Sequence, residues 1–313
     1  MSVHGNALRA WVERAFGNER RPITVRLDEW ATPDLADDRG LLRAGKLLEW
    51  MDVLGPLAAS RHCQSPVTTA AVDRLTLRRP IRMGQHVRLL ARVGYTSLRS
   101  VGVALTVDAE GAPCATGWMT FVALRDGRAV PVPQIRPRSM AERTQFREGR
   151  LRHEQHRRHD VRPAIPAWDE LTGRASFVHK IEPVRGTVRS GTLMRWIEAA
   201  ANLSARAHVG AQVGFEKLLG LAFLEPIRPN VYVHIRSLVA RVADRAIDVF
   251  VHAESEDPVS GARSDAVCAF ARYAPPSGQA IPALECASDA ERILREHVGH
   301  RSAFERSLEV GRG

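Results

Sequence analysis

One stretch of this sequence occurs twice, 146 positions apart, and the repeat limits the folds that the chain can adopt. The first copy is residues 45–52 (GKLLEWMD), and the second is residues 191–198 (GTLMRWIE). Each copy begins with glycine and ends with a carboxylate two positions after a tryptophan. The same spacing relates the Pro-Ile-Arg tripeptides at 80–82 and 226–228. An offset that stays constant over about forty residues indicates a tandem duplication of one domain.

Each copy continues into a pattern typical of an α+β domain. The helix predicted to begin at Gly45 is apolar on nearly all sides, which indicates that the rest of its domain wraps around it. Alternating apolar residues then predict strands at 87–93 and 101–107, with a hairpin turn at 110–111. A strongly twisted antiparallel sheet around one buried helix satisfies this order. The predicted fold class is therefore α+β, with two tandem domains of this kind.

The sequence predicts five parts, and its 313 residues suit two domains of ordinary size. They are an N-terminal extension with a short amphipathic helix (1–22), a first domain (23–133), an Arg-rich helical linker (134–166), a second domain (167–284), and a C-terminal helix and tail (285–313).

The chain is basic, with a net charge of +10, so it should attract polyanions. Nucleic acid and a phosphate-rich molecule such as coenzyme A are both candidates, and an Arg-rich composition without a binding role is a third explanation. Many of the cations lie in the linker, where Phe146 is the only aromatic side chain able to stack on a base. A solvated linker is therefore favoured over a nucleic-acid site.

Several other classes of protein lack their expected signals. No apolar run approaches the ~20 residues of a membrane span, and the N-terminus does not resemble a signal peptide. The four cysteines lie far apart, so we expect no metal site, no disulfide framework and a reduced cytoplasmic setting. Nucleophile-elbow, Walker and Rossmann motifs are also missing.

The repeated helix contains the strongest candidates for chemistry. Asp52 and Glu198 are carboxylates in helices that should be largely buried, and burial raises a carboxyl pKa toward the range of a general base. Gly45 and Gly191 open these helices, where free N–H groups could stabilise an oxyanion. The competing explanation is that each glycine only permits a tight turn.

Two further features concern binding and asymmetry. Arg78, Arg79, Arg82 and Arg228 flank the Pro-Ile turns, where they could meet phosphates or serve only as exposed solubilising residues. In the loop before the first helix, Asp37 precedes a glycine by three residues, but the second repeat has proline at that spacing. The two loops differ chemically, which predicts that one of two pseudo-symmetric sites performs most of the activity.

Residues 42–52 (LRAGKLLEWMD) resemble the helix motif of hot-dog-fold acyl-CoA thioesterases. Residues 67–73, 80–84 and 120–133 fit the same family, and the second repeat keeps 191–198. The resemblance implies a tandem hot-dog chain of the cytosolic acyl-CoA hydrolase type. In such chains the active sites lie at the interface of the two domains, and trimers are the common assembly.

The resemblance also implies roles for individual residues. In the family, an asparagine in the loop before one helix and a carboxylate in the helix of the facing domain act on the thioester, and the helix N-terminus polarises its carbonyl. The helix carboxylates correspond to Asp52 and Glu198, but the loop asparagine corresponds to Asp37 and Pro183. The absence of this asparagine has three possible meanings: altered chemistry, a single surviving site, or a weak enzyme.

The sequence thus predicts a cytoplasmic, homo-oligomeric acyl-CoA thioesterase, which hydrolyses acyl-CoA to free acid and CoA by carboxylate-assisted attack of water. No cofactor is expected beyond the coenzyme A of the substrate. One alternative is a catalytically weak or inactive hot-dog protein that binds acyl-CoA or acyl-carrier-protein thioesters. Another is a nucleic-acid-binding protein that uses the Arg-rich linker.

Overall fold

The computed structural model describes residues 22–158, 165, 168, 176–243, 245–277, 279–285 and 288–310. The amphipathic helix predicted near the N-terminus lies outside these residues, as do the end of the predicted linker and the last three residues.

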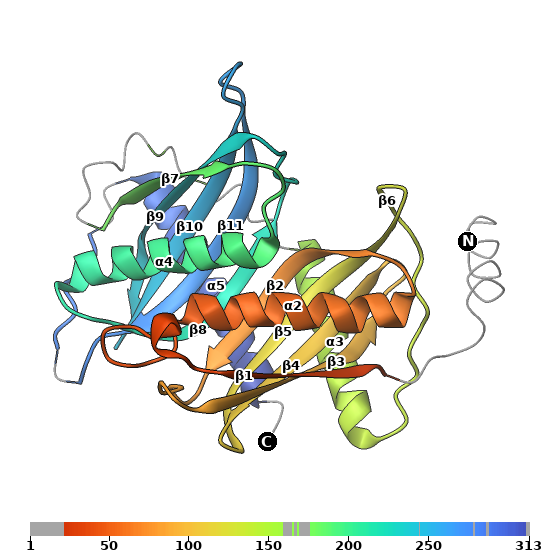
Figure 1. The fold of residues 1–313 in the computed structure, drawn as a ribbon. Coiled ribbons are helices and arrows are strands. Elements are labelled where there is room, and N and C mark those ends of the chain that lie inside the picture. Colours follow the sequence, from red (N-terminus) through yellow and green to blue (C-terminus); the bar gives the residue numbers. More distant parts are fainter. Residues whose placement is uncertain are drawn as a thin grey trace.

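Two similar series of elements follow one another along the chain (Figure 1). The first consists of β1 (Thr24–Trp30), the short helix η1 (Pro33–Leu35), α2 (Ala44–Cys63), β2 (Val67–Leu77), β3 (His86–Thr96), β4 (Ser100–Ala109), β5 (Ala112–Arg125) and β6 (Arg128–Ala129). After α3 (Met140–Arg158), the second consists of β7 (Val178–Val184), α4 (Ser190–Val209), β8 (Gly214–Phe223), β9 (Val231–Ala243), β10 (Ala246–Glu256) and β11 (Arg263–Ala274), followed by α5 (Asp289–Val310).

The strands of both halves form one antiparallel sheet, in the order β1-β3-β4-β5-β2-β8-β11-β10-β9-β7. The halves join where β2 pairs with β8, through pairs such as Val72 with Leu221 and Leu75 with Leu218. The predicted α+β class, the repeat and the antiparallel sheets are therefore confirmed. The two repeated helices begin within one residue of the glycines that predicted them.

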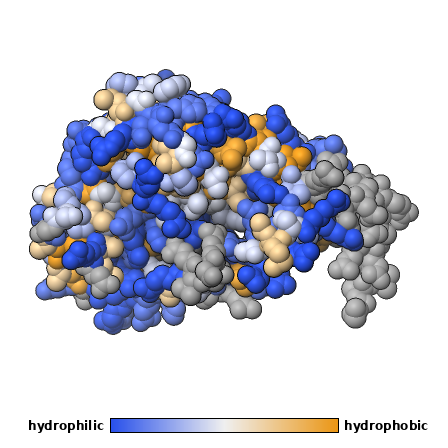
Figure 2. All heavy atoms as spheres, turned by 90° about the horizontal axis from the view of Figure 1, so that it is seen from below, coloured by the Kyte–Doolittle hydropathy of each residue, from blue (hydrophilic) through white to orange (hydrophobic). Residues whose placement is uncertain are grey.

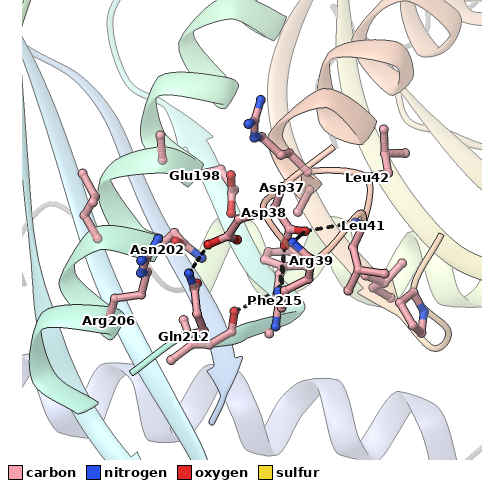
Figure 3. Close-up of a pocket in the computed structure, with 18 of the residues that line it drawn as sticks. Asp37, Asp38, Arg39, Leu41, Leu42, Glu198, Asn202, Arg206, Gln212 and Phe215 are labelled. Carbon is pink, nitrogen blue, oxygen red and sulfur yellow. Dashed lines mark hydrogen bonds and ion pairs between the residues drawn. The ribbon is translucent and has the colours of Figure 1, made fainter. Parts of the chain in front are cut away.

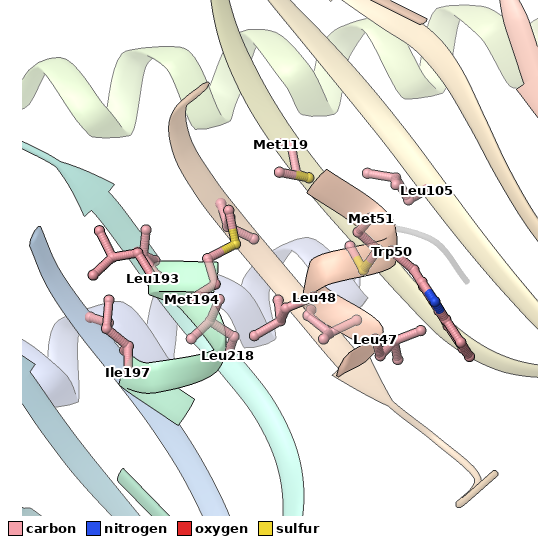
Figure 4. Packing of buried hydrophobic residues seen from close by; sticks show 14 of the residues in the cluster. Leu47, Leu48, Trp50, Met51, Leu105, Met119, Leu193, Met194, Ile197 and Leu218 are labelled. Carbon is pink, nitrogen blue, oxygen red and sulfur yellow. The ribbon is translucent and has the colours of Figure 1, made fainter. Parts of the chain in front are cut away.

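α2 and α4 lie on the same face of this sheet, and their apolar sides share one core. Leu48 of α2 and Leu193 and Met194 of α4 belong to that core, which continues across the junction of the halves (Figure 4). α5 covers the opposite face of the second half, because Leu294 and Val298 pack in a separate cluster with Phe250. The core therefore fixes how α2 and α4 lie relative to one another.

The Arg-rich linker forms a helix as predicted, but the expectation that it is solvated is wrong for one of its sides. Arg152 of α3 is only 2% exposed and lies over the ring of Trp118, 6.0 Å from the ring centre. A Cβ atom at Gly149 would come within 2.3 Å of the Cβ of Tyr95, so the glycine allows close packing. α3 thus packs against the first half of the sheet, which removes Arg152 from any nucleic-acid surface.

The surface is mainly hydrophilic on the side seen in Figure 2, with small separate apolar patches. Large exposed apolar side chains include Trp30, Val53 and Leu57. Among the helices of the described residues, none is both long and apolar enough to cross a membrane.

Candidate active site

The first turns of α2 and α4 approach one another closely at the interface of the two halves. A Cβ atom on Gly45 would lie 3.2 Å from the Cα of Arg195, and one on Gly191 would lie 3.2 Å from the Cα of Glu49. Neither glycine has a positive φ angle, so neither serves a tight turn. A Cβ atom at either position would be tighter than most such contacts, so glycine favours the close approach of the two helices.

This approach gives each helix a cap from the other half of the chain. The N-cap residues Arg43 and Arg189 make no capping hydrogen bond with their own side chains. The Gly191 N–H instead donates to Oδ2 of Asp52 at 2.7 Å, and the Gly45 N–H donates to the carboxylate of Glu198. A carboxylate at a helix N-terminus satisfies free N–H groups and interacts favourably with the helix dipole. The repeated carboxylates and the repeated glycines therefore form two reciprocal pairs.

Asp52 is held by three donors. Besides Gly191, the hydroxyl of Ser190 donates to Oδ2 at 2.6 Å, and the hydroxyl of Thr69 donates to Oδ1 at 3.2 Å. Burial raises the pKa of Asp52 above its ordinary value, although these three hydrogen bonds oppose the rise. Both carboxylate oxygens are thus occupied by protein donors.

Glu198 has a different environment. Its Oε1 accepts a hydrogen bond from the hydroxyl of Tyr273 at 3.1 Å, while its Oε2 lies toward Gly45. The residue as a whole keeps some exposure, but its carboxyl group is enclosed by protein atoms. Burial raises the pKa of Glu198 to about 7, against the lowering effects of Tyr273, Gly45 and Arg43. A carboxyl group with this pKa can accept or release a proton near neutrality.

A cavity of about 610 Å³, the Glu198 pocket, lies beside this carboxyl group. Figure 3 shows Glu198, Asn202 and Arg206 on α4, opposite the loop 37–41 that leads to α2. Five arginines line the pocket: Arg39, Arg43, Arg78, Arg79 and Arg206. Apolar side chains such as Leu203 and Phe215 line other parts of its wall. The pocket thus combines the carboxyl group of Glu198, the carboxylates of Asp37 and Asp38, a larger number of arginines and apolar surface.

A second cavity, the Thr69 pocket, lies on the pseudo-symmetric side near Asp52. It measures about 430 Å³, and Thr69 and Ser190, two of the partners of Asp52, line it. Its other walls are largely apolar, and Glu225 is its charged residue. None of the described residues that line it is Arg or Lys. The two sites are therefore electrostatically unlike.

Only two of the four arginines predicted to bind phosphate line one of these two pockets. Arg78 and Arg79 line the Glu198 pocket, whereas Arg82 and Arg228 are exposed residues that line neither of the two pockets. The sequence did not single out Arg39, Arg43 and Arg206, which also line the Glu198 pocket.

Asp37 lies in the loop where the resemblance implied an asparagine. Its Oδ1 accepts hydrogen bonds from the backbone N–H groups of Arg39 and Leu41, at 2.9 and 3.0 Å, and its Oδ2 pairs with the guanidinium of Arg39 at 2.9 Å. Burial alone would raise its pKa, but these bonds outweigh burial and the pKa lies below its ordinary value. The ionised Asp37 shapes the loop and, through its charge, raises the pKa of Glu198.

One group in the described residues has the spacing of a metal site, on the second half of the sheet. The ligand atoms of His252, Glu254 and Asp265 lie within 4.8 Å of one another. However, the Trp168 indole N–H donates to Nδ1 of His252 at 3.0 Å, so Nε2 must bear the proton that is shared with Asp265 at 2.9 Å. A protonated Nε2 cannot bind a metal, and Glu254 already pairs with Arg236. The group is therefore a hydrogen-bonded network.

Other residues of the site had only weak signals in the sequence. Asn202 and Arg206 follow Glu198 at intervals of four, so helical spacing could have assigned them to the same side of α4. Tyr273 reaches Glu198 from a distant strand, and no local pattern indicates that contact.

Comparison with known proteins relates this chain to thioesterases. The profile of the thioesterase superfamily matches residues 40–114. The human cytosolic acyl coenzyme A thioester hydrolase is 31% identical over 123 residues, which cover 36% of this chain and 32% of the human protein. The chain thus matches about a third of the length of that relative.

One further relative and one solved structure are covered more completely. An uncharacterized acyl-CoA thioester hydrolase of Bacillus subtilis is 30% identical over 135 residues, which cover 38% of this chain and 78% of that protein. The crystal structure of a putative oleoyl thioesterase from Lactobacillus plantarum covers 84% of this chain and 98% of its own, with a TM-score of 0.56 and 9% identity, so it shows the fold alone. This chain belongs to the thioesterase superfamily, and its fold is the tandem hot dog of the acyl-CoA thioester hydrolases.

Proposed function

We propose that this protein hydrolyses acyl-CoA to a free acid and CoA, and that the reaction takes place at Glu198. The observation that carries the proposal is a carboxyl group with a pKa of about 7, set against the N-terminus of the facing helix in an arginine-lined pocket. A base poised near neutrality, a backbone oxyanion donor and cations for phosphates are the parts that hydrolysis of a CoA thioester requires.

In the proposed reaction the carbonyl oxygen of the thioester replaces Oε2 of Glu198 as the acceptor of the Gly45 N–H. The freed carboxylate takes a proton from water, and the oxygen of that water attacks the carbonyl carbon. The Gly45 N–H and the dipole of α2 then stabilise the negative charge on the tetrahedral oxyanion. When the C–S bond breaks, the departing thiolate receives the proton from Glu198, which returns to its starting form.

In this proposal Asp52 has a structural role, because it holds α2 of the first half against the start of α4. Three donors already occupy its carboxylate, and the pocket beside it offers no described cation to a phosphate. The difference in local charge therefore favours the Glu198 side for a polyanionic substrate.

Wild-type protein is expected to release free thiol from acyl-CoA, which a thiol-reactive dye can follow. Replacing Arg78 and Arg79 with Ala should raise KM for acyl-CoA about tenfold, because charge-assisted bonds to phosphate are lost. The same variant should hydrolyse an acyl-pantetheine, which lacks the nucleotide phosphates, as well as wild type does.

The control for this experiment is the double variant Arg82→Ala with Arg228→Ala, which removes the same charge from exposed positions that line neither pocket. Its KM should stay near that of wild type. Equal increases in the two double variants would instead indicate a general field effect and would remove the argument for phosphate binding at Arg78 and Arg79.

Asp37→Asn restores the residue that the family resemblance implies, and it should lower the pH at which the protein becomes active. The charge of Asp37 raises the pKa of Glu198, so its removal favours the ionised base at lower pH. The midpoint of the acidic limb in a plot of kcat/KM against pH should fall below its wild-type position. An unmoved midpoint would show that Arg39, released from Asp37, or solvent compensates for the lost charge.

Location and assembly remain further parts of the proposal. The human relative is named cytosolic, which supports a cytoplasmic location for this chain. We retain the prediction of a homo-oligomer, a trimer of double hot dogs, and light scattering coupled to size-exclusion chromatography measures it directly.

A further inference from the structure

The two halves supply a hydroxyl donor to their carboxylates from different strands. In the first half, Thr69 on β2 donates to Asp52, and its cross-strand partner on β5 is Phe121. In the second half, the position 146 residues after Thr69 is Phe215 on β8, which has no hydroxyl. The cross-strand partner of Phe215 on β11 is Tyr273. The hydroxyl is thus on the helix-following strand β2 in the first half and on the last strand β11 in the second, and the phenylalanine is on the partner strand in each case.

This arrangement keeps a donor beside the carboxylate in spite of the lost threonine. The Tyr273 hydroxyl donates to Oε1 of Glu198 at 3.1 Å and to the backbone oxygen of Glu198 at 3.2 Å. The Tyr273 side chain is fully buried, and its ring packs edge-on against Phe215 with centroids 5.7 Å apart. The strand register and this ring contact place the Tyr273 hydroxyl next to Glu198 of α4.

We propose that Tyr273 is the positioning residue for the Glu198 base, in place of the strand threonine that holds Asp52. The inference rests on the proposed function of the Glu198 site and names a further residue of that site. When a thioester carbonyl takes the Gly45 N–H, Oε2 of Glu198 is released and Tyr273 on Oε1 remains its side-chain donor. That one bond then fixes the orientation in which the carboxylate meets water.

The test is Tyr273→Phe, which removes the hydroxyl and keeps the ring against Phe215. The loss of a donor to the charged form disfavours ionised Glu198, so the acidic limb of kcat/KM should move to higher pH by about one pH unit. The value of kcat on the high-pH plateau should fall about tenfold, because the carboxylate is less well oriented, while KM changes little. A purely structural role for the hydroxyl would not move the acidic limb.

Thr69→Val provides the matched control, because it removes the corresponding hydroxyl from Asp52. Its acidic limb should coincide with that of wild type. If the limb moves in Thr69→Val, or stays in place in Tyr273→Phe, the proposed role of Tyr273 is wrong.

A second readout separates this inference from the proposed function. In protein with ¹³C-labelled glutamate side chains, the Glu198 carboxyl resonance is identified by its loss in Glu198→Gln and then titrated by NMR. Tyr273→Phe should raise the pKa of Glu198 whether or not any acyl-CoA is hydrolysed. Absent hydrolysis by wild type would reject the proposed function, whereas an unchanged titration would reject the role of Tyr273.

Discussion

Glu198→Gln is expected to lower kcat for acyl-CoA hydrolysis by about 10³-fold, within the range that a general base contributes. The amide is nearly isosteric with the carboxylate, and its oxygen can still accept a hydrogen bond from Tyr273 or Gly45. It cannot take a proton from water near neutral pH. The loss should therefore appear in kcat, with KM for acyl-CoA near its wild-type value.

Asp52→Asn makes the same chemical change at the pseudo-symmetric position, and it should retain most of the wild-type kcat. Both variants are best compared by thiol release at a temperature where circular dichroism shows each to be folded. A large loss in Asp52→Asn with an active Glu198→Gln would move the reaction to the other interface. Equal losses would mean that both carboxylates take part.

The same Glu198→Gln variant should be more stable than wild type above pH 7, by about 1–3 kcal/mol. The pKa of Glu198 is about 7 in the folded protein, compared with an ordinary value of 4.5. The folded state therefore binds this proton more tightly than the unfolded state, and wild-type stability falls as pH rises from about 4.5 to 7. Glutamine has no charge to bury, so the stability difference should open across this range and then stay constant.

Asp37→Asn should show the opposite sign in the same denaturant-unfolding series. The pKa of Asp37 is lowered in the folded protein, so its ionised form stabilises the fold above the unfolded-state pKa. Its replacement should be destabilising at pH 8, and the difference in stability from wild type should vanish as the solution is acidified.

For the Glu198→Gln prediction, the contradicting outcome is a variant that is less stable than wild type at pH 8. That result would mean that the hydrogen bonds from Gly45 and Tyr273 outweigh the cost of burying the charge.

The sequence was informative wherever the signal was local. Helical periodicity and the repeat gave the starts of α2 and α4 to within one residue, because an apolar helix and its opening glycine are adjacent in the chain. The pattern also singled out Asp52 and Glu198, since a repeated carboxylate in an apolar helix is conspicuous.

Contacts between the halves could not be predicted in this way. The pairing of Asp52 with Gly191 depends on how two separate helices cross, and that depends on the whole shared core. The Tyr273 contact depends on strand register, which shifts at irregularities in β11. Nor does proximity to a turn reveal which way an arginine side chain points, so the sequence alone does not separate Arg82 and Arg228 from Arg78 and Arg79.

The reciprocal caps of α2 and α4 have a consequence for how such a protein can diverge. In a dimer of identical single domains, any substitution at the crossing would occur twice, so both carboxylates would have to keep the same task. Joining the copies in one chain releases them from that symmetry. Asp52 and Glu198 are already different residues with different donors, and in the proposed function one crossing holds the halves together while the other provides the base. A single chain that carries both copies allows such a division of labour.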